Sequence, residues 1–398
     1  MTRWRSQEVA PKALRADQKL EQQVMASGLA APFLRLPRSY AQRRATFDTP
    51  MKLAGLLLLV LVAVALPSLV SSYYVGVASV MLLAVPGAAA LNAVQGVAGQ
   101  VSAGNAALMA VGVFAAAFVL HEMPGMPFLL VLVFGGIAGG LVGALIGIPA
   151  MRTRGLYLLI ATLALQFIVE YVFEVYQQHT VGSAGFIFLN ATIGSYAIDT
   201  TVRWYYVLLV AGVLAIVVLK NWVGSRAGRS WFAIRHSEAT ASILGIDVAR
   251  TKVAVFVASS ALIGVQGVIF AYYTGVVQYN TLTFDVAIQY IAIVIIGGQA
   301  SVLGVVFGVI FVEGLPYLLQ YFGSHIPSWF PDQSLFQQHV YDLQDVIYGF
   351  FIIIFLLYAP RGLVEIWERL GMRIRLRALR QELRIEPGES LRGREGRA

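Results

Sequence analysis

Long apolar runs separated by short polar segments fill this chain from residue 53 to residue 360. A helix needs about 20 mostly apolar residues to cross a hydrocarbon core of about 30 Å. Ten runs reach or approach that length, so we expect an all-α polytopic membrane protein with about ten transmembrane helices. The runs are Leu53–Val70, Tyr73–Gln95, Asn105–Leu120, Pro127–Pro149, Gly155–Val175, Val202–Leu219, Val253–Val277, Val286–Gly297, Leu303–Tyr321 and Asp345–Tyr358.

The positions of the basic residues predict the orientation. Of 29 Lys and Arg, ten lie in residues 1–52, ten in residues 361–398 and six in residues 220–252. Cytoplasmic segments carry an excess of Lys and Arg, and ten spans place all three clusters on one side. We therefore expect both termini in the cytoplasm. The organisation predicted is a basic leader (1–52), a transmembrane permease domain (53–360) with a cytoplasmic loop (220–252), and an Arg-rich tail (361–398).

Composition narrows the function classes. Hydrophobic residues make up 58% of the 398 residues and charged residues 13%, and there is no cysteine. The net charge of +8 comes from the three cytoplasmic clusters, which favours anionic membrane lipid as the partner over nucleic acid. No lysine follows a glycine, as a phosphate-binding P-loop requires, and no two His have metal-ligand spacing. We expect no cofactor, no metal and no catalytic residues.

The loop 220–252 is predicted to contain two short helices. Ala227–His236 carries aromatic and aliphatic residues among basic ones. Ser237 is suited to cap a second helix, Glu238 to its first turn and Gly245 to the position after its end. Such a helix pair in a loop is either a membrane-surface element or a docking element for a cytoplasmic partner.

Four segments in order resemble bacterial ABC importer permeases of the branched-chain amino acid family, LivM type. They are GQVSAGNAALMAVGVFAAAF (99–118), RGLYLLIATLAL (154–165), GRSWFAIRHSEATASILGIDVARTKVAVFVASSALIGVQGVIFAYY (228–273) and SVLGVVFGVIF (301–311). The similarity covers roughly residues 53–360. The chain departs from the family at Gln166 and Phe167, where many members have a glutamate, and at Ala300, where they have glycine. Gly245 is also one residue further from Glu238 than the family spacing.

The resemblance implies a function, a location and partners. The chain would be the permease subunit of an importer for branched-chain amino acids or a related small solute in the bacterial inner membrane. It would pair with a second, related permease, with cytoplasmic ABC ATPase subunits and with a periplasmic solute-binding protein. The loop residues expected to couple it to the ATPases are Arg235, Glu238, Ala239, Ala241 and Gly245.

Glycine-bearing segments in the two halves suggest where solute passes. GQVSAG (99–104) is echoed by GQAS (298–301), which indicates two repeat-like halves with interrupted helices near the midplane. The alternative is that these small residues only allow close helix packing, which is the interpretation we favour for GGIAGGLVGALIG (135–147). The polar pathway candidates are Gln100, Ser102, Asn105, Gln299, Ser301 and the mid-span Glu313.

Two other functions remain open from the sequence. A self-sufficient secondary transporter or channel would need an intramembrane coupling site, for which Glu313 is the one mid-span candidate. A membrane-embedded enzyme would need a carboxylate or His cluster, and none is placed for chemistry. Both are less consistent with the chain than an importer permease.

Overall fold

Apolar helices account for most of the chain in the computed structural model. It describes residues 63–152, 155–189, 191–193, 196–324, 340–358 and 362–365, which all belong to one unit, Val62–Gly371. Eight helices in the described residues are long and apolar enough to cross a membrane, and a shorter apolar stretch, Val346–Phe355, lies in a ninth. Most of the first predicted span, Leu53–Val70, lies outside the described residues, so the count of ten stays a prediction.

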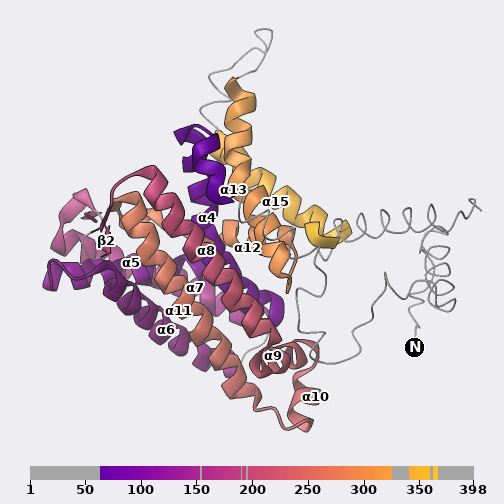
Figure 1. Cartoon of the computed structure of the whole chain (residues 1–398). Helices are drawn as coiled ribbons and strands as arrows, with labels where there is room; N and C mark the ends of the chain where they lie inside the picture. Colours follow the sequence, from indigo (N-terminus) through magenta and orange to yellow (C-terminus); the bar gives the residue numbers. More distant parts are fainter. Residues whose placement is uncertain are drawn as a thin grey trace, which may run out of the picture. The chain divides into compact units, whose positions relative to one another are not determined.

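The helices follow one another with short connections (Figure 1). They are α4 (Ser72–Leu91), α5 (Asn105–Glu122), α6 (Phe128–Arg152), α7 (Leu156–Thr180), α8 (Thr201–Gly224), α9 (Arg226–His236), α10 (Glu238–Ile243), α11 (Val248–Thr274), α12 (Phe284–Gly297), α13 (Val302–Ser324) and α15 (Val340–Tyr358), with a π-helix η1 (Asn92–Val97) and 3₁₀ turns η2 (Gly182–Ala184) and η3 (Tyr279–Thr281).

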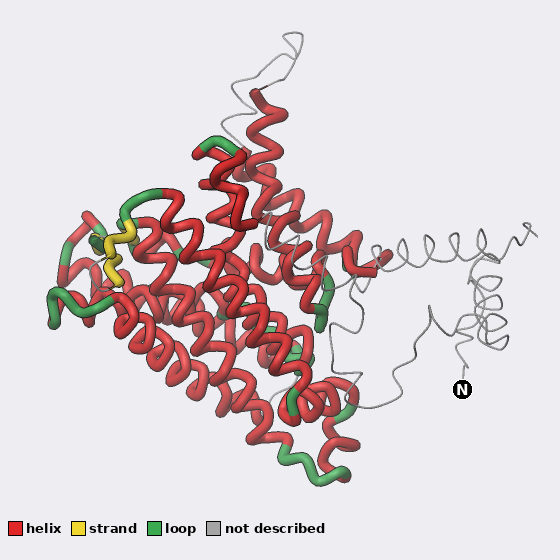
Figure 2. Tube along the Cα trace, viewed as in Figure 1, coloured by secondary structure: helices red, strands yellow, loops and turns green. Residues whose placement is uncertain are grey.

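Four short strands complete the described fold, and the sequence did not predict them. β1 (Phe186–Ile187) pairs antiparallel with β4 (Val276–Val277), and β2 (Ala191–Ile193) pairs antiparallel with β3 (Tyr196–Ile198). Figure 2 shows strand at one end of a body that is otherwise helical, and Figure 1 places β2 and the α9–α10 pair at opposite ends. We call these ends the strand end and the loop end.

Local capping explains where several helices differ from the predicted spans. α11 begins at Val248, five residues before the predicted span, because the Asp247 side chain accepts a hydrogen bond from the Arg250 N–H and caps its N-terminus. The α8 N-terminus is capped in the same way by Thr200. Polar caps therefore lengthened helices beyond the apolar runs from which they were predicted.

Glycine backbones allow α6 and α11 to pack closely. A Cβ on Gly264 of α11 would lie 2.2 Å from the Gly135 carbonyl oxygen, and one on Gly139 would lie 2.4 Å from the Ser260 carbonyl oxygen. Contacts this short leave no room for a side chain, as at small-residue interfaces of membrane helices. The packing role predicted for residues 135–147 is confirmed.

Candidate functional site

The α9–α10 pair has the local structure predicted for it. The Ser225 hydroxyl accepts from the Gly228 N–H at 3.1 Å and caps α9. The Ser237 hydroxyl accepts from the Thr240 N–H at 3.2 Å and caps α10. Gly245, with a φ of +80°, follows the turn that ends α10, where glycine adopts a left-handed conformation at little cost. The predicted Ser237 cap and Gly245 stop signal are confirmed, whereas the Ser225 cap was not predicted.

One face of α9 packs into the membrane domain. Trp231 and Ile234 are buried, and the Trp231 ring meets Trp222 of α8 edge-on, with centroids 6.0 Å apart. On α10, Ala241 is buried, whereas Ile243 and Leu244 are 84% and 71% exposed. The pair is thus anchored by one apolar face and presents a second apolar surface outward.

Arg235, at the end of α9, connects the loop to two interrupted segments of the membrane domain. Its Nη1 donates to the Gly96 carbonyl oxygen, and its Nη2 donates to Gln299 Oε1 at 3.1 Å. Its aliphatic stem covers Gly99, where an added Cβ would lie 2.7 Å from Arg235 Cγ. Partial burial lowers the pKa of the guanidinium from its ordinary value, but an arginine remains charged throughout the physiological range.

A second contact joins the same two segments behind Arg235. The Ala300 N–H donates to Asn92 Oδ1 at 2.8 Å, and Asn92 Nδ2 donates to the Ser301 carbonyl oxygen at 2.9 Å. Ala300 has a φ of +60° and is the one non-glycine residue with positive φ among the described residues. The Asn92 amide therefore holds a backbone conformation that alanine adopts only at a cost.

Glu238 faces inward. Its carboxylate lies 2.8 Å from Lys252 Nζ on α11, with the two side chains 18% and 3% exposed. Lys252 Nζ also lies 3.4 Å from the Ala150 carbonyl oxygen at the end of α6. Glu238 therefore fixes α10 to the membrane domain, and its expected role in coupling to the ATPase stays a prediction.

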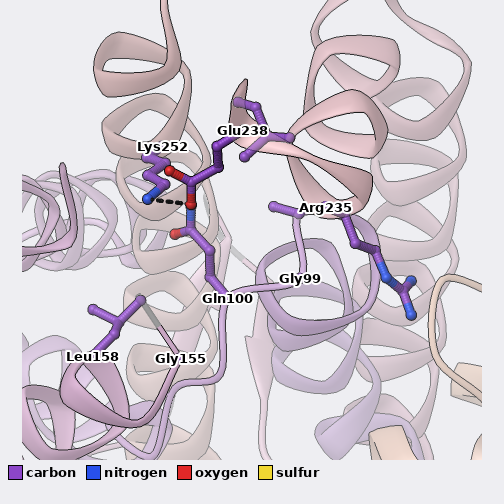
Figure 3. Close-up of a pocket in the computed structure, with 9 residues that line it drawn as sticks. Gly99, Gln100, Gly155, Leu158, Arg235, Glu238 and Lys252 are labelled. Atoms are coloured by element: carbon purple, nitrogen blue, oxygen red, sulfur yellow. Dashed lines mark ion pairs between the residues drawn. The ribbon is translucent and has the colours of Figure 1, made fainter. Parts of the chain in front are cut away.

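A small polar cavity of about 100 Å³ lies beside this ion pair. Figure 3 shows the Gln100 amide directed at Glu238 and Lys252, while the Arg235 side chain points away from them. Gln100 is 6% exposed, and neither amide atom has a hydrogen-bond partner among the described residues. Gln100 therefore lines the cavity with an unpaired amide beside the ion pair.

The other pathway candidates are distributed among three places. Ser301 stays at the loop end, where its hydroxyl accepts from the Gly304 N–H at 3.1 Å. Ser102 and Asn105 lie in the buried segment that leads to α5, and the Ser102 hydroxyl accepts from Gly104 N at 3.4 Å. Glu313 on α13 is 8% exposed and interacts electrostatically with Tyr290 of α12, apart from the others.

Lys252 and Asn92 are site residues that the sequence did not single out. Lys252 was counted only as one of the six basic residues of the loop, and Asn92 falls within an apolar run. A polar amide inside an apolar run was the available signal for Asn92, because buried polar groups in a membrane need partners. Nothing in the sequence distinguished Lys252 from the other basic residues.

Comparison with known proteins places the chain among transport proteins. The family model described as "Branched-chain amino acid transport system / permease component" matches residues 69–356. The high-affinity branched-chain amino acid transport system permease protein LivM of Salmonella typhimurium is 28% identical over 68% of this chain and 69% of its own length. LivM of Escherichia coli matches to the same extent.

A more distant relative carries a different solute in its name. The galactose/methyl galactoside import permease protein MglC of Haemophilus influenzae is 30% identical over 31% of this chain and 38% of its own length. No solved structure matches the chain.

Proposed function

This chain belongs to the family of branched-chain amino acid transport system permease components, and from that membership we propose that it conducts an amino acid or related small solute through the bacterial inner membrane. In this proposal it is one of two related permease subunits of an ABC importer. ATP is hydrolysed by separate cytoplasmic subunits, and a periplasmic binding protein delivers the solute.

The observation that carries the proposal is the attachment of the loop helices to interrupted segments of the membrane domain. Arg235 bonds to both the 96–99 and the 298–301 segments, and Glu238 bonds to α11. Movement of the α9–α10 pair would therefore displace the end of η1, the Gln299 side chain and the start of α11 directly. A secondary transporter has no need for a movable cytoplasmic helix pair with this attachment.

The outward apolar surface of the pair suggests where the ATPase docks. Ile243 and Leu244 are exposed in a loop that the basic-residue distribution places in the cytoplasm, beyond the membrane. Exposed aliphatic side chains at such a position are favourable only when a partner covers them. We assign them as the residues that enter the ATPase surface.

A pull-down of the tagged chain from gently solubilised membranes tests this function. We expect a P-loop ATPase and a second permease to co-purify, and Ile243→Asp together with Leu244→Asp to reduce the recovered ATPase about tenfold. Ile187→Asp is the matched control, because Ile187 is 68% exposed but lies at the strand end. A chain that purifies alone and transports solute in liposomes without ATP would overturn the proposal.

A further inference from the structure

Two helices, α5 and α12, begin beside the first half of α7. Gly104, just before α5, lies against Thr162 and Leu165, because a Cβ on it would be 3.2 Å from the Thr162 carbonyl oxygen. Phe284, the first residue of α12, packs against Phe167 with ring centroids 6.2 Å apart. Thr162, Leu165 and Phe167 lie about 9–17 Å from the start of α7, whose axis is about 37 Å long.

The segments that precede the two helices enter from opposite ends. Residues 99–104 come from the loop end, where Gly99 contacts Arg235, and the Ala103 N–H then donates to Thr162 Oγ1 at 2.9 Å. The other segment comes from the strand end, where the Tyr279 N–H donates to Gln177 Oε1 at 2.8 Å. It reaches the first half of α7 where Gln166 Nε2 donates to the Leu282 carbonyl oxygen at 3.0 Å.

This arrangement brings two helix N-termini to positions inside the length of α7, away from both of its ends. α5 runs from there to the strand end, since Phe114 stacks on Phe173 with centroids 3.7 Å apart. α12 runs to the loop end, where Gly298 follows it, and the two helices are in contact. A helix N-terminus carries about half a positive charge and unpaired N–H groups, and interrupted helices of transporters direct such ends at anionic solute groups.

An unpaired side chain lies at the α5 N-terminus. Asn105 is its first residue and is 1% exposed, and neither its amide nitrogen nor its amide oxygen has a hydrogen-bond partner in the part of the chain that the structure describes. Gln166 Oε1 is also buried and unpaired there. An unsatisfied buried amide costs about 1–3 kcal/mol, so Asn105 is costly unless a ligand bonds to it during the transport cycle.

A carboxylate lies in the first turn of α12. Asp285 is exposed, and its Oδ2 accepts from the Thr283 hydroxyl at 3.5 Å. Charged side chains within a membrane span face a water-filled path or a protein partner rather than lipid. The two adjoining helix starts therefore differ in charge: α5 offers N–H donors and an amide, and α12 offers an anion.

We propose that the adjoining N-terminal turns of α5 and α12 form a transient site for a zwitterionic α-amino acid. The solute carboxylate bonds to the free N–H groups of α5 and to Asn105, and its ammonium group bonds to Asp285. The inference rests on the proposed function and adds a solute class to it. The site is closed in this conformation, since Asn105 is buried, and opens when the helices separate during turnover. Neutral sugars lack both charges and are disfavoured there.

The absence of native cysteine in this chain allows a direct test. Asn105→Cys and Asp285→Cys are introduced singly into the full complex in membranes. Each is reacted with an anionic or a cationic methanethiosulfonate reagent, at rest and during ATP turnover, and labelling is measured by the mass of the tagged chain. Leu214→Cys on α8 is the control, because the Leu214 side chain is 58% exposed and lies outside the proposed site.

We expect turnover to accelerate labelling at both sites about tenfold. At position 105 the anionic reagent should react faster than the cationic reagent. Leucine at millimolar concentration should slow labelling at both positions, whereas galactose and the amino alcohol of leucine should not protect position 105. Asn105→Leu and Asp285→Asn should each lower leucine uptake about tenfold without loss of the ATPase.

The outcomes separate this inference from the proposed function. If the ATPase co-purifies and turns over but both cysteines remain as unreactive as Leu214→Cys, or galactose protects as well as leucine, the amino-acid site is overturned and the importer function stands. If no ATPase co-purifies and uptake needs no ATP, the importer function fails, and the labelling pattern without ATP still decides the site.

Discussion

The two segments that lead to α5 and α12 are held by different chemistry. At the loop end, the segment 96–104 is held by a cation, Arg235, next to the Glu238–Lys252 ion pair. At the strand end, the segment 276–283 is held by neutral amides: Gln177 Oε1 accepts from the Tyr279 N–H, and Gln278 Nε2 donates to the Ser183 carbonyl oxygen at 3.3 Å. The β1–β4 pairing adds backbone hydrogen bonds there.

This difference indicates which end is built to move. Every contact at the strand end joins parts of the membrane domain to one another, so breaking it lowers stability. The contacts at the loop end join the membrane domain to α9 and α10, which carry the exposed Ile243 and Leu244. A displacement of α9 would therefore reach the interrupted segments through Arg235, and a displacement of α10 would reach α11 through the Glu238–Lys252 ion pair. The predictions below test this contrast.

The largest effect is expected from Glu238→Lys. It replaces an ion pair with two adjacent cations, one of them Lys252, which is 3% exposed. Loss of one partner of a buried pair costs about 3–5 kcal/mol, and we expect the lower end because Glu238 is 18% exposed. Uptake in reconstituted vesicles should be abolished while ATP hydrolysis continues.

The charge-swapped double variant Glu238→Lys with Lys252→Glu is the control for that substitution. It restores opposite charges at the same two positions, so a substantial part of the uptake should return. Wild-type uptake in the single variant would remove Glu238 from coupling. Failure of the double variant to recover any uptake would contradict a role for the Glu238–Lys252 ion pair in coupling.

Arg235→Ala should have the next largest effect. It removes two hydrogen bonds from a charged donor, each worth about 1.5–3 kcal/mol, so we expect uptake per ATP hydrolysed to fall about tenfold or more. Arg229→Ala is the matched control, because the Arg229 guanidinium donates at 3.3 Å only to the Ser225 carbonyl oxygen of its own loop. Equal losses in both variants would contradict a special role for Arg235.

Gln177→Leu tests the strand end. The Tyr279 N–H loses its acceptor, which should cost about 1–3 kcal/mol and lower the thermal unfolding midpoint of the purified complex. The ratio of uptake to ATP hydrolysis should not change. Gln178→Leu, at an exposed position one residue on, should leave the midpoint unaltered. A change in the uptake ratio without a change in the midpoint would place coupling at this end also.

The smallest effect is expected from Ala300→Gly. Glycine adopts a φ of +60° without the cost of about 1–2 kcal/mol that alanine incurs, but it loses up to about 1 kcal/mol of conformational entropy. We expect a rise of a degree or two in the unfolding midpoint. Ala300→Val should lower it clearly, since a β-branched residue is poorly suited to this conformation. A lower midpoint with glycine would contradict strain at Ala300.

Much of the architecture follows from local pattern. The apolar runs located the eight long helices of the described residues, and the Ser237 cap and Gly245 stop defined α10. The predicted packing role of the 135–147 glycines was also confirmed. These features depend on neighbours within a few turns of helix, so one sequence contains their signals.

The candidate site was predicted less completely. The sequence pointed to Arg235 and Glu238, whose coupling role stays a prediction, but the inward direction of Glu238 was not foreseen, because it depends on Lys252 fourteen residues away. The helix starts beside α7 were not predicted, and the repeat relation between segments 99–104 and 298–301 stays a prediction. The sequence matched segment 99–104 with 298–301, whereas the structure brings 99–104 and 276–283 to α7 from opposite ends.

The sequence by itself determined that this protein is a helical membrane protein with a helix pair in its central basic loop, because hydrophobicity, charge and caps are local properties. Only the tertiary structure decided that α5 and α12, with Asn105 and Asp285 in their first turns, both begin beside the first half of α7, and that Arg235 joins two segments 200 residues apart. Those facts depend on how α7 packs against both halves of the chain, and contacts of that range leave no periodic trace along a single sequence.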